Sequence, residues 1–373
     1  MATSQFSIYT SSDVNGPGPM HGWSGSLIQV LDYCLTSGSV SKSSAGWSKP
    51  IANSASLDGI TPAYACYRPP SGSRMTLFVN DYFPNATAAG KEAWLTGWET
   101  ISSLCGAAVT ANVGVGTGQF PTPAQQLTTG HVVCRKSSVS DNSTDHYWVA
   151  FADAYTFYLF IQNGDSAEYY ACITFGDVFS FGGSADAYRC LLIGWGTENA
   201  VGAWSQPYAA GSVIGYDNFA CSMGYFLSQG SATGYNAYLP YPLVGHYMAR
   251  TSGGGGASIA VGKTFDFSKQ TTNGNVNGGS PYGAIAMGGN IQTPNSADNS
   301  LYLSPVTIHE PSSYGLRGRM RGFWQVAHPV ANFSDGQTFA GGGDYAGKSF
   351  MIIKTDITGG FFAMETSNTV ETN

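Results

Sequence analysis

A long apolar stretch over residues 146–161 constrains the fold more than any other part of the chain. Between residues 147 and 151, aromatic and β-branched side chains alternate with their neighbours, which is the period of a β-strand. Asp153-Ala154 interrupts the stretch, Asn163-Gly164 follows it as a turn dipeptide typical of hairpins, and residues 169–175 can supply the returning strand. We therefore expect antiparallel strands at the centre of this fold.

A helix precedes this sheet in the sequence. Apolar side chains recur at helical spacing within residues 24–36, Ser24 can cap the first turn, and Gly38 lies just beyond the last residue. The residues that carry the pattern are Leu27, Ile28, Leu31 and Leu35. We predict an amphipathic helix over residues 24–36. Periodicity leaves open whether residues 92–99 and 187–193 form helices or strands.

A hairpin is expected between the helix and the long apolar stretch. Residues 63–67 and 75–79 are strand-like, and a Pro-Pro-Ser-Gly-Ser loop that begins at Pro69 separates them. Residues 1–200 are therefore predicted to form one N-terminal α+β domain, in which an antiparallel sheet packs against one or two helices. The predicted fold class is α+β and β-rich.

The composition changes after residue 200. Residues 201–300 are rich in Gly, Asn and Ser, and within them residues 269–300 carry almost no large apolar side chain. Such a stretch cannot bury enough surface to pack on itself, so we predict loops or an arm that becomes ordered against a neighbouring protein. Strand-like segments return over residues 301–373, where we expect a small C-terminal β unit.

The charge of the chain excludes several partners. Only 10% of the residues are charged, the formal net charge is −7, and the 16 Lys and Arg residues form no run. A duplex needs a basic stripe, so we expect no direct contact with nucleic acid. The longest apolar stretch is too short for a membrane span, and the first residues have no features of a secretion signal. We therefore expect synthesis in a cytoplasm.

Seven cysteines are spread over the chain at wide, irregular spacing and include no Cys-x-x-Cys pair. This spacing fits neither a zinc site nor a dense disulfide framework. We predict that most of the thiols are free and buried, as in proteins made in a reducing compartment.

Few residues suggest catalysis. The six histidines include no His-x-His or His-Glu-x-x-His spacing, so a metal site would need ligands from distant segments. Two facing carboxylates could hydrolyse a glycoside, but aspartates are also common at strand ends and turns. The aspartates of the strand-rich segment are Asp153, Asp165, Asp177 and Asp186. The alternating glycines of residues 114–118 lack the Gly-Lys-Ser/Thr ending of a phosphate loop. We predict no enzyme activity, no catalytic residue, no cofactor and no metal site.

A basic segment near the C-terminus is the candidate interaction site. In a strand, Arg317, Arg319 and Arg321 would lie on one face, because successive side chains alternate between the two faces. Together with Trp324 they could form an interface with an acidic neighbour or an anion. The alternative, which the sequence leaves open, is a solvated strand edge whose charge discourages aggregation.

Several stretches resemble segments of a known protein family. They are Asp153–Phe160, Phe175–Phe181, Asp186–Tyr188, Leu316–Trp324 and Glu365–Ser367, with the shorter Gly46–Lys49, Ala65–Arg68 and Phe120–Thr122. These stretches resemble a family of uncharacterised virion proteins of tailed bacteriophages, which are encoded among head, neck and tail genes. The resemblance covers residues 1–195 and 300–373. It implies a virion component and transfers no catalytic residue.

Together these features predict a structural component of a tailed-phage virion, in the tail, neck or baseplate. It would be made in the bacterial host cytoplasm, form homo-oligomers and contact other virion proteins. One alternative is a capsid-decorating or receptor-binding protein that recognises a host surface glycan through exposed aromatic side chains. A less supported alternative is an enzyme that degrades surface polysaccharide, because such enzymes usually need a long β-helical repeat and the sequence has no repeat of fixed period.

Overall fold

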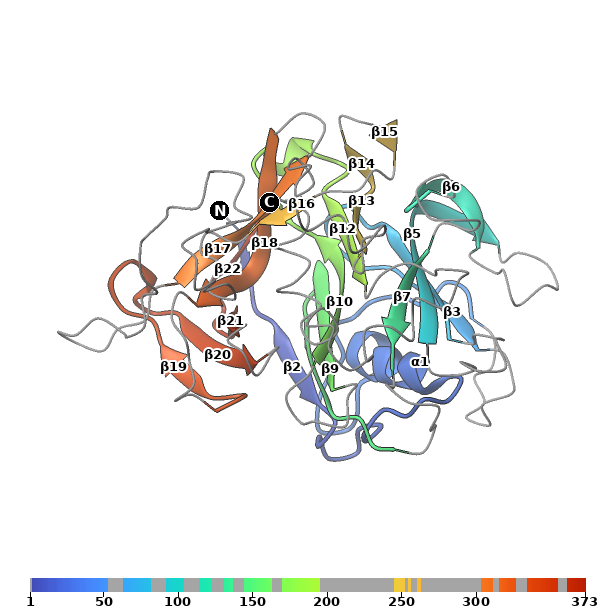
Figure 1. The fold of residues 1–373 in the computed structure, drawn as a ribbon, viewed down its shortest axis with the longest axis horizontal. Coiled ribbons are helices and arrows are strands. Elements are labelled where there is room, and N and C mark those ends of the chain that lie inside the picture. Colours follow the sequence, from blue (N-terminus) through green and yellow to red (C-terminus); the bar gives the residue numbers. More distant parts are fainter. Residues whose placement is uncertain are drawn as a thin grey trace, which may run out of the picture.

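The computed structural model shows a β-rich chain with antiparallel sheets and one helix of 12 residues (Figure 1). It describes residues 2–52, 63–81, 92–103, 114–122, 131–136, 144–162, 170–194, 245–251, 254–255, 260–262, 303–310, 315–326, 334–354 and 361–373. The predicted fold class, α+β and β-rich, is confirmed. Within these residues, no helix has the length and hydrophobicity needed to cross a membrane.

A six-stranded antiparallel sheet forms the centre of the molecule, with the strand order β13-β12-β10-β9-β8-β2. The bounds are β2 Ser7–Thr10, β8 Trp148–Ala152, β9 Thr156–Gln162, β10 Tyr170–Asp177, β12 Cys190–Gly194 and β13 Gly245–Met248. The long apolar stretch supplies β8 and β9, and its interruption at Asp153 becomes the turn between them. Strand β10 is the returning strand that was predicted, and β12 shows that residues 187–193 lead into a strand. The dipeptide Asn163-Gly164 lies outside the described residues.

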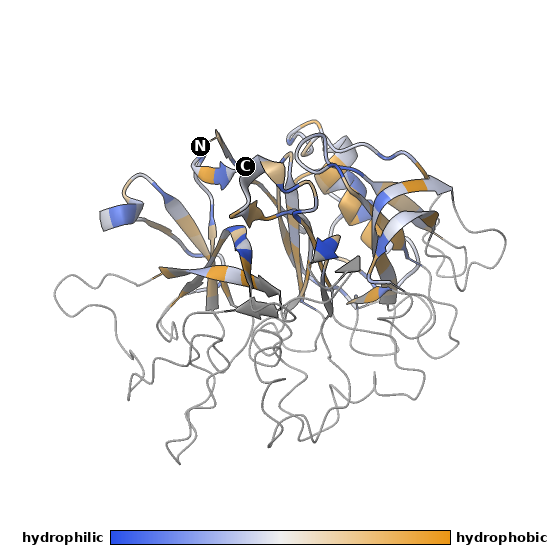
Figure 2. Cartoon of the chain, turned by 90° about the horizontal axis from the view of Figure 1, so that it is seen from above, coloured by the Kyte–Doolittle hydropathy of each residue, from blue (hydrophilic) through white to orange (hydrophobic). Residues whose placement is uncertain are grey.

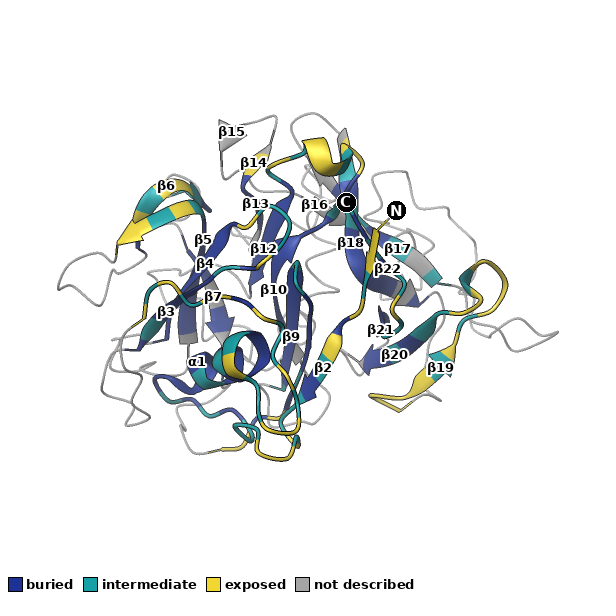
Figure 3. Ribbon diagram, turned by 180° about the vertical axis from the view of Figure 1, so that it is seen from behind, coloured by how far each residue is buried: buried dark blue, intermediate teal, exposed yellow. Residues whose placement is uncertain are grey.

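Both faces of this sheet are buried (Figure 3). Along β9, Phe157, Leu159 and Ile161 belong to a first hydrophobic core, whereas Tyr158 and Phe160 belong to a second core on the opposite face. Figure 2 shows the corresponding layers of strands side by side. Because β9 lies between two layers, its sequence is almost continuously apolar instead of alternating between apolar and polar residues.

The first core lies between the central sheet, the helix and a five-stranded sheet, in which β4 lies between β3 and β5, and β5 also pairs with β6 and β7. The bounds are β3 Tyr64–Tyr67, β4 Thr76–Asn80, β5 Glu92–Ser103, β6 Val115–Phe120 and β7 Val132–Arg135. Strands β3 and β4 form the predicted hairpin. Residues 92–99 belong to a strand, because Ala93 and Leu95 enter the first core while Trp98 packs on the opposite face, which is the period of two.

The helix covers nearly the predicted range. An α-helical part, α1, spans Ser26–Leu31 and continues as a π-helical part, η1, over Asp32–Ser37. Gly25 occupies the N-cap position with a φ of 85°, and Gly38 follows the last turn with a φ of 62°. Both positions need a left-handed backbone, which glycine adopts without steric strain. The predicted end at Gly38 is confirmed.

Gly25, and not Ser24, occupies the N-cap position. The Asp81 carboxylate caps this helix instead, and its Oδ2 accepts hydrogen bonds from the backbone N–H groups of Leu27 at 2.8 Å and Ile28 at 3.2 Å. Lys136 forms a fully buried ion pair with the other oxygen of Asp81 and donates a hydrogen bond to the carbonyl oxygen of Trp23. A carboxylate 54 residues along the chain from Leu27 satisfies the free donors of the first turn, which no local pattern could indicate.

The second core lies between the central sheet and a seven-stranded sheet, whose order is β16-β17-β18-β21-β20-β19, with β11 also paired to β18. The bounds are β11 Phe179–Ser180, β16 Ala260–Gly262, β17 Leu303–Glu310, β18 Gly315–Val326, β19 Thr338–Ala340, β20 Ser349–Lys354 and β21 Phe361–Glu365. Next to this sheet, the two ends of the chain pair with each other as β1 (Ala2–Ser4) and β22 (Val370–Thr372).

Strand pairing connects the segments that composition separated at residues 200 and 300. Strands β13 and β16 fall within residues 201–300, and they join the central and seven-stranded sheets respectively. The same segment holds a two-stranded pair, β14 (Arg250–Thr251) and β15 (Gly254–Gly255). The predicted arm over residues 269–300 lies outside the described residues.

Candidate functional site

Strand β18 carries all four residues of the predicted interaction site. The three arginines occupy alternate positions along this strand, and Trp324 follows near its end. Strand β18 lies in the interior of the seven-stranded sheet, where it pairs with β11, β17 and β21. This position brings the arginines against segments from both ends of the chain.

Arg321 is buried, with only 1% of its side chain exposed. Its guanidinium donates to both carboxylate oxygens of Asp153, at 2.7 and 3.1 Å. The same group donates to Ser4 Oγ of β1 at 2.6 Å, to the Glu371 carbonyl oxygen of β22 at 3.0 Å and to Thr156 Oγ1 at 2.8 Å. A single guanidinium therefore ties the two terminal strands to the turn between β8 and β9, using the fork of donors that arginine provides.

Arg317 forms a two-point ion pair with Asp186, in which Nε and Nη2 donate at 2.9 and 2.7 Å. Ser180 Oγ also donates to Asp186. Burial tends to raise the pKa of Asp186, but the hydrogen bonds from Arg317 and Ser180 and the charge of Arg317 outweigh it and hold the pKa below its usual value. The Asp186 carboxylate is therefore charged at neutral pH.

Arg319 is the most exposed of the three arginines, with 26% of its side chain exposed. It forms an ion pair with the Glu371 carboxylate of β22, and its guanidinium lies over the ring of Phe179 at 4.7 Å. Partial burial lowers the pKa of Arg319. The acidic neighbours predicted for the arginines thus exist within this chain, and a contact with another chain stays a prediction.

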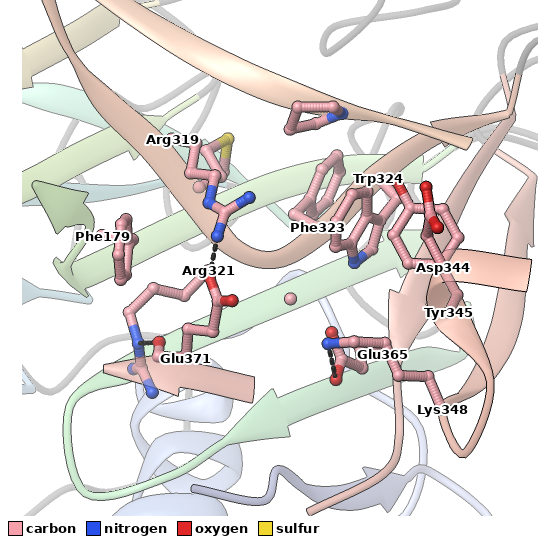
Figure 4. Close-up of a pocket in the computed structure, with 13 residues that line it drawn as sticks. Phe179, Arg319, Arg321, Phe323, Trp324, Asp344, Tyr345, Lys348, Glu365 and Glu371 are labelled. Atoms are coloured by element: carbon pink, nitrogen blue, oxygen red, sulfur yellow. Dashed lines mark hydrogen bonds and ion pairs between the residues drawn. The ribbon is translucent and has the colours of Figure 1, made fainter. Parts of the chain in front are cut away.

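A pocket of about 210 Å³ opens beside Arg319 and Trp324 (Figure 4). Strand β18 forms one side of it. The charged residues around it include Arg319, Lys348, Glu365 and Glu371, and Tyr345 completes the aromatic wall with Trp324. The rings of Trp324 and Tyr345 meet edge to face with centroids 4.9 Å apart.

Two polar groups of this pocket are of particular interest, a donor on Trp324 and the carboxylate of Glu365. Trp324 is 7% exposed, and its buried Nε1 donates to no atom of the residues that the structure describes. Among the described residues, Oε1 of Glu365 accepts hydrogen bonds from Lys348 at 2.8 Å, Ser367 at 3.1 Å and Thr369 at 2.5 Å. In Figure 4 the nitrogen edge of Trp324 and the other oxygen of Glu365 turn toward the same space.

An exposed apolar patch lies close to the arginines. We define the patch as Phe181 and Leu316, whose side chains are 52% and 41% exposed. The Phe181 N–H donates to the carbonyl oxygen of Arg317 at 3.0 Å, which places the two segments side by side. Phe179, beneath Arg319, contacts Phe181 edge to face. Phe179 also lines the pocket, so the segment that carries Phe181 connects the arginine ion pairs with the pocket.

Three of the four aspartates considered as catalytic candidates each form an ion pair with a different arginine. Asp153 pairs with Arg321, Asp186 pairs with Arg317, and Asp177 pairs with Arg189 at 2.8 Å. Asp165 lies outside the described residues. Residues 115–118 of the glycine-rich segment form part of β6, which is a strand and not a loop. Across the described part of the chain, no group of three or more His, Cys, Asp or Glu residues could hold a metal ion.

The five described cysteines are all free and buried, namely Cys34, Cys66, Cys134, Cys172 and Cys190. The prediction of free thiols is confirmed for these five, and Cys105 and Cys221 lie outside the described residues. Burial raises the pKa of the Cys66 and Cys172 thiols to about 12, so both are protonated and unreactive at neutral pH.

The sequence pattern predicted a site on β18, but it gave no indication of most of the other residues that line the pocket. Lys348, Glu365 and Glu371 come from the last 26 residues, and no local spacing connects them with Arg319. Glu365 was noted only within the stretch that resembles virion proteins. Comparison of the chain with protein-family models and with curated proteins finds no match.

Proposed function

We propose that the chain is a structural component of a tailed-phage virion, in the tail, neck or baseplate, that acts through contacts with other protein surfaces. The exposed patch of Phe181 and Leu316 carries this proposal. Protein interfaces commonly have an apolar centre surrounded by polar groups, with aromatic residues and arginine enriched. The patch has this composition, because Arg317 and Arg319 lie directly beside it.

The first partner we propose for the patch is a second copy of this chain. The rim of the patch carries both signs of charge, since Arg317 is paired with Asp186 and Arg319 with Glu371. Two copies of such a surface can meet without net repulsion between like charges. The ion pairs also hold the long arginine side chains in place before binding, which lowers the entropy cost of association.

The contact can be tested with the purified full-length chain. We expect the double variant Phe181→Ser/Leu316→Ser to have a smaller mass than the wild-type oligomer in light scattering. Val14→Ser/Val40→Ser is the matched control. Val14 and Val40 are likewise exposed apolar residues, but they lie in the loops around the helix and not beside β18. An unchanged mass in the patch variant, with the melting temperature also unchanged, would refute the contact.

The virion assignment needs a separate experiment. Antibodies against the chain, carrying gold particles, should label purified particles of a phage that encodes it, at one repeated position. The position of the label would distinguish tail, neck and baseplate from a capsid decoration. Particles that carry no label and contain none of the chain by mass spectrometry would refute the virion role.

A further inference from the structure

We propose that the pocket beside Trp324 binds a neutral, polyhydroxylated ligand, namely a single sugar residue. This proposal does not depend on the virion role or on the oligomer contact. It rests on the arrangement of donors, acceptors and aromatic rings around the pocket (Figure 4).

The donor on Trp324 and the carboxylate of Glu365 select the ligand. Trp324 Nε1 is a buried donor, and leaving such a group without a partner is costly. The second carboxylate oxygen of Glu365, Oε2, is an acceptor that faces the same space. A hydroxyl group placed between them can accept from Trp324 and donate to Glu365 at the same time. Alcohols and sugars carry such groups, whereas a phosphate at neutral pH offers mainly acceptors.

The charges around the pocket favour a neutral ligand. Lys348 is paired with Glu365, and Arg319 is paired with Glu371, so neither cation is available for a two-point contact with an anion. An anion would also approach the three carboxylates of Asp344, Glu365 and Glu371, and a cation would approach the ammonium and guanidinium groups. A neutral molecule with several hydroxyl groups can use both halves of each ion pair without like-charge repulsion.

The size and walls of the pocket fit one sugar ring. Its volume of about 210 Å³ is below the range typical of drug-sized ligands. Phe179 and Tyr345 contribute apolar surface against which the C–H groups of a sugar could pack. Polar groups at two sides and aromatic rings between them would fix the orientation of the ring.

The binding test uses the full chain, a panel of free monosaccharides in calorimetry and an array of immobilised glycans. We expect at least one neutral monosaccharide to bind with a Kd of about 1 mM or tighter. Binding on the array, with the same sugar at the free end of a glycan, would identify a glycan terminus as the source. Binding of the free sugar alone would identify a small-molecule ligand. Inorganic phosphate, tested in parallel, should not bind. Binding of phosphate without binding of any sugar would overturn the proposal.

Two variants connect binding to this pocket. Trp324→Phe removes the indole N–H and keeps an aromatic ring, and Glu365→Gln removes the charge and keeps the shape. Each should weaken sugar binding at least tenfold. Asp186→Asn is the control, because Asp186 also pairs with an arginine of β18 but does not line the pocket. Because Trp324 packs on Tyr345 and Phe350, the smaller ring of Trp324→Phe should lower the melting temperature, so binding is compared at a temperature at which the wild type and all variants are folded. Sugar binding that both variants leave intact would overturn the proposal, as would no binding of any sugar.

Discussion

Each side of the central sheet contains a buried ion pair, and the two ion pairs have different structural roles. On the side of the helix, Lys136 and Asp81 are both completely buried, and Asp81 caps the first turn of α1. On the side of the seven-stranded sheet, Arg321 and Asp153 are almost completely buried, and Arg321 also binds Ser4 and Glu371. One pair fixes the start of a helix, and the other joins the two ends of the chain.

The difference follows from the two cations. Lysine presents a compact ammonium group, which suits a single buried carboxylate and one carbonyl oxygen. Arginine presents a planar fork of five donors, which can reach several acceptors in different strands. The arginine therefore appears where four segments meet, and the lysine appears where one carboxylate must be held at a helix start. The following experiments test whether the two pairs are as different as their geometry indicates.

Replacing Arg321 should have the largest effect. Arg321→Met leaves the Asp153 carboxylate buried without its counter-charge, and we expect the free energy of unfolding to fall by about 3–5 kcal/mol in denaturant titrations. Hydrogen exchange should become faster in β1 and β22, because Arg321 binds both strands. Arg319→Met is the control, and its partly exposed ion pair should cost about 1 kcal/mol or less. Equal losses in the two variants would contradict the assigned role of Arg321.

Replacing Lys136 should cost less, and the loss should depend on pH. We expect Lys136→Met to lose about 3 kcal/mol at neutral pH. Burial already raises the pKa of Asp81 above its ordinary 3.8, with Lys136 acting against this effect. In the variant the folded chain therefore takes up a proton at a higher pH than the unfolded chain, so its stability should recover as the pH falls. The double variant Asp81→Asn/Lys136→Met should be more stable than Lys136→Met. If it is less stable, a lone buried carboxylate is not the cause.

His131 makes the helix side sensitive to acid. Its ring stacks on Trp94 with centroids 3.9 Å apart, and burial lowers its pKa to about 3. The unfolded chain binds a proton near pH 6.5 and the folded chain does not, so the stability should fall below pH 6.5 by about 1.4 kcal/mol per pH unit from this group. His131→Phe keeps a stacked ring and should remove that part of the slope. An identical pH dependence in the wild type and the variant would show that His131 is not responsible.

Asp186→Asn should have the smallest effect. It weakens the ion pair with Arg317 at the edge of the seven-stranded sheet, and we expect a loss of about 1 kcal/mol at neutral pH. Because the folded pKa of Asp186 is held below 3.8, its contribution is complete above that pH and is lost as the pH falls below it. The difference in melting temperature between wild type and variant should therefore be largest at neutral pH and become smaller as the pH falls below 3.8. A difference that persists at low pH would point to lost packing instead of lost charge.

Local pattern predicted the elements of the central sheet well and the ends of the helix only in part. The run from residue 146 to residue 161 indicated β8 and β9 because a strand buried on both faces needs apolar residues throughout. Gly38 indicated the helix end because its left-handed backbone is a local requirement. The start of the helix could not be predicted from local pattern, because its capping carboxylate, Asp81, lies in a different part of the chain.

Residues 92–99 are a second case in which the local pattern did not decide the structure. Their spacing fitted a helix or a strand, and the choice depended on β4, β6 and β7, which pair with this segment as β5. Pairing between strands is a property of distant segments, so the segment alone does not contain the information.

The sequence by itself determined the fold class, the core strands, the free thiols of the five described cysteines and the location of three arginines on one strand. Each depends on the order of residues within a single segment, such as the alternation of Arg317, Arg319 and Arg321. Only the tertiary structure decided what that strand contacts. Asp153, Asp186 and Glu371, which neutralise the three arginines, come from three other parts of the chain. The pocket residues Lys348 and Glu365 are likewise brought to Trp324 by the pairing of β18, β21 and β20. Electrostatic and hydrogen-bonding partners are set by distances in space, and these exist only once the sheets have assembled.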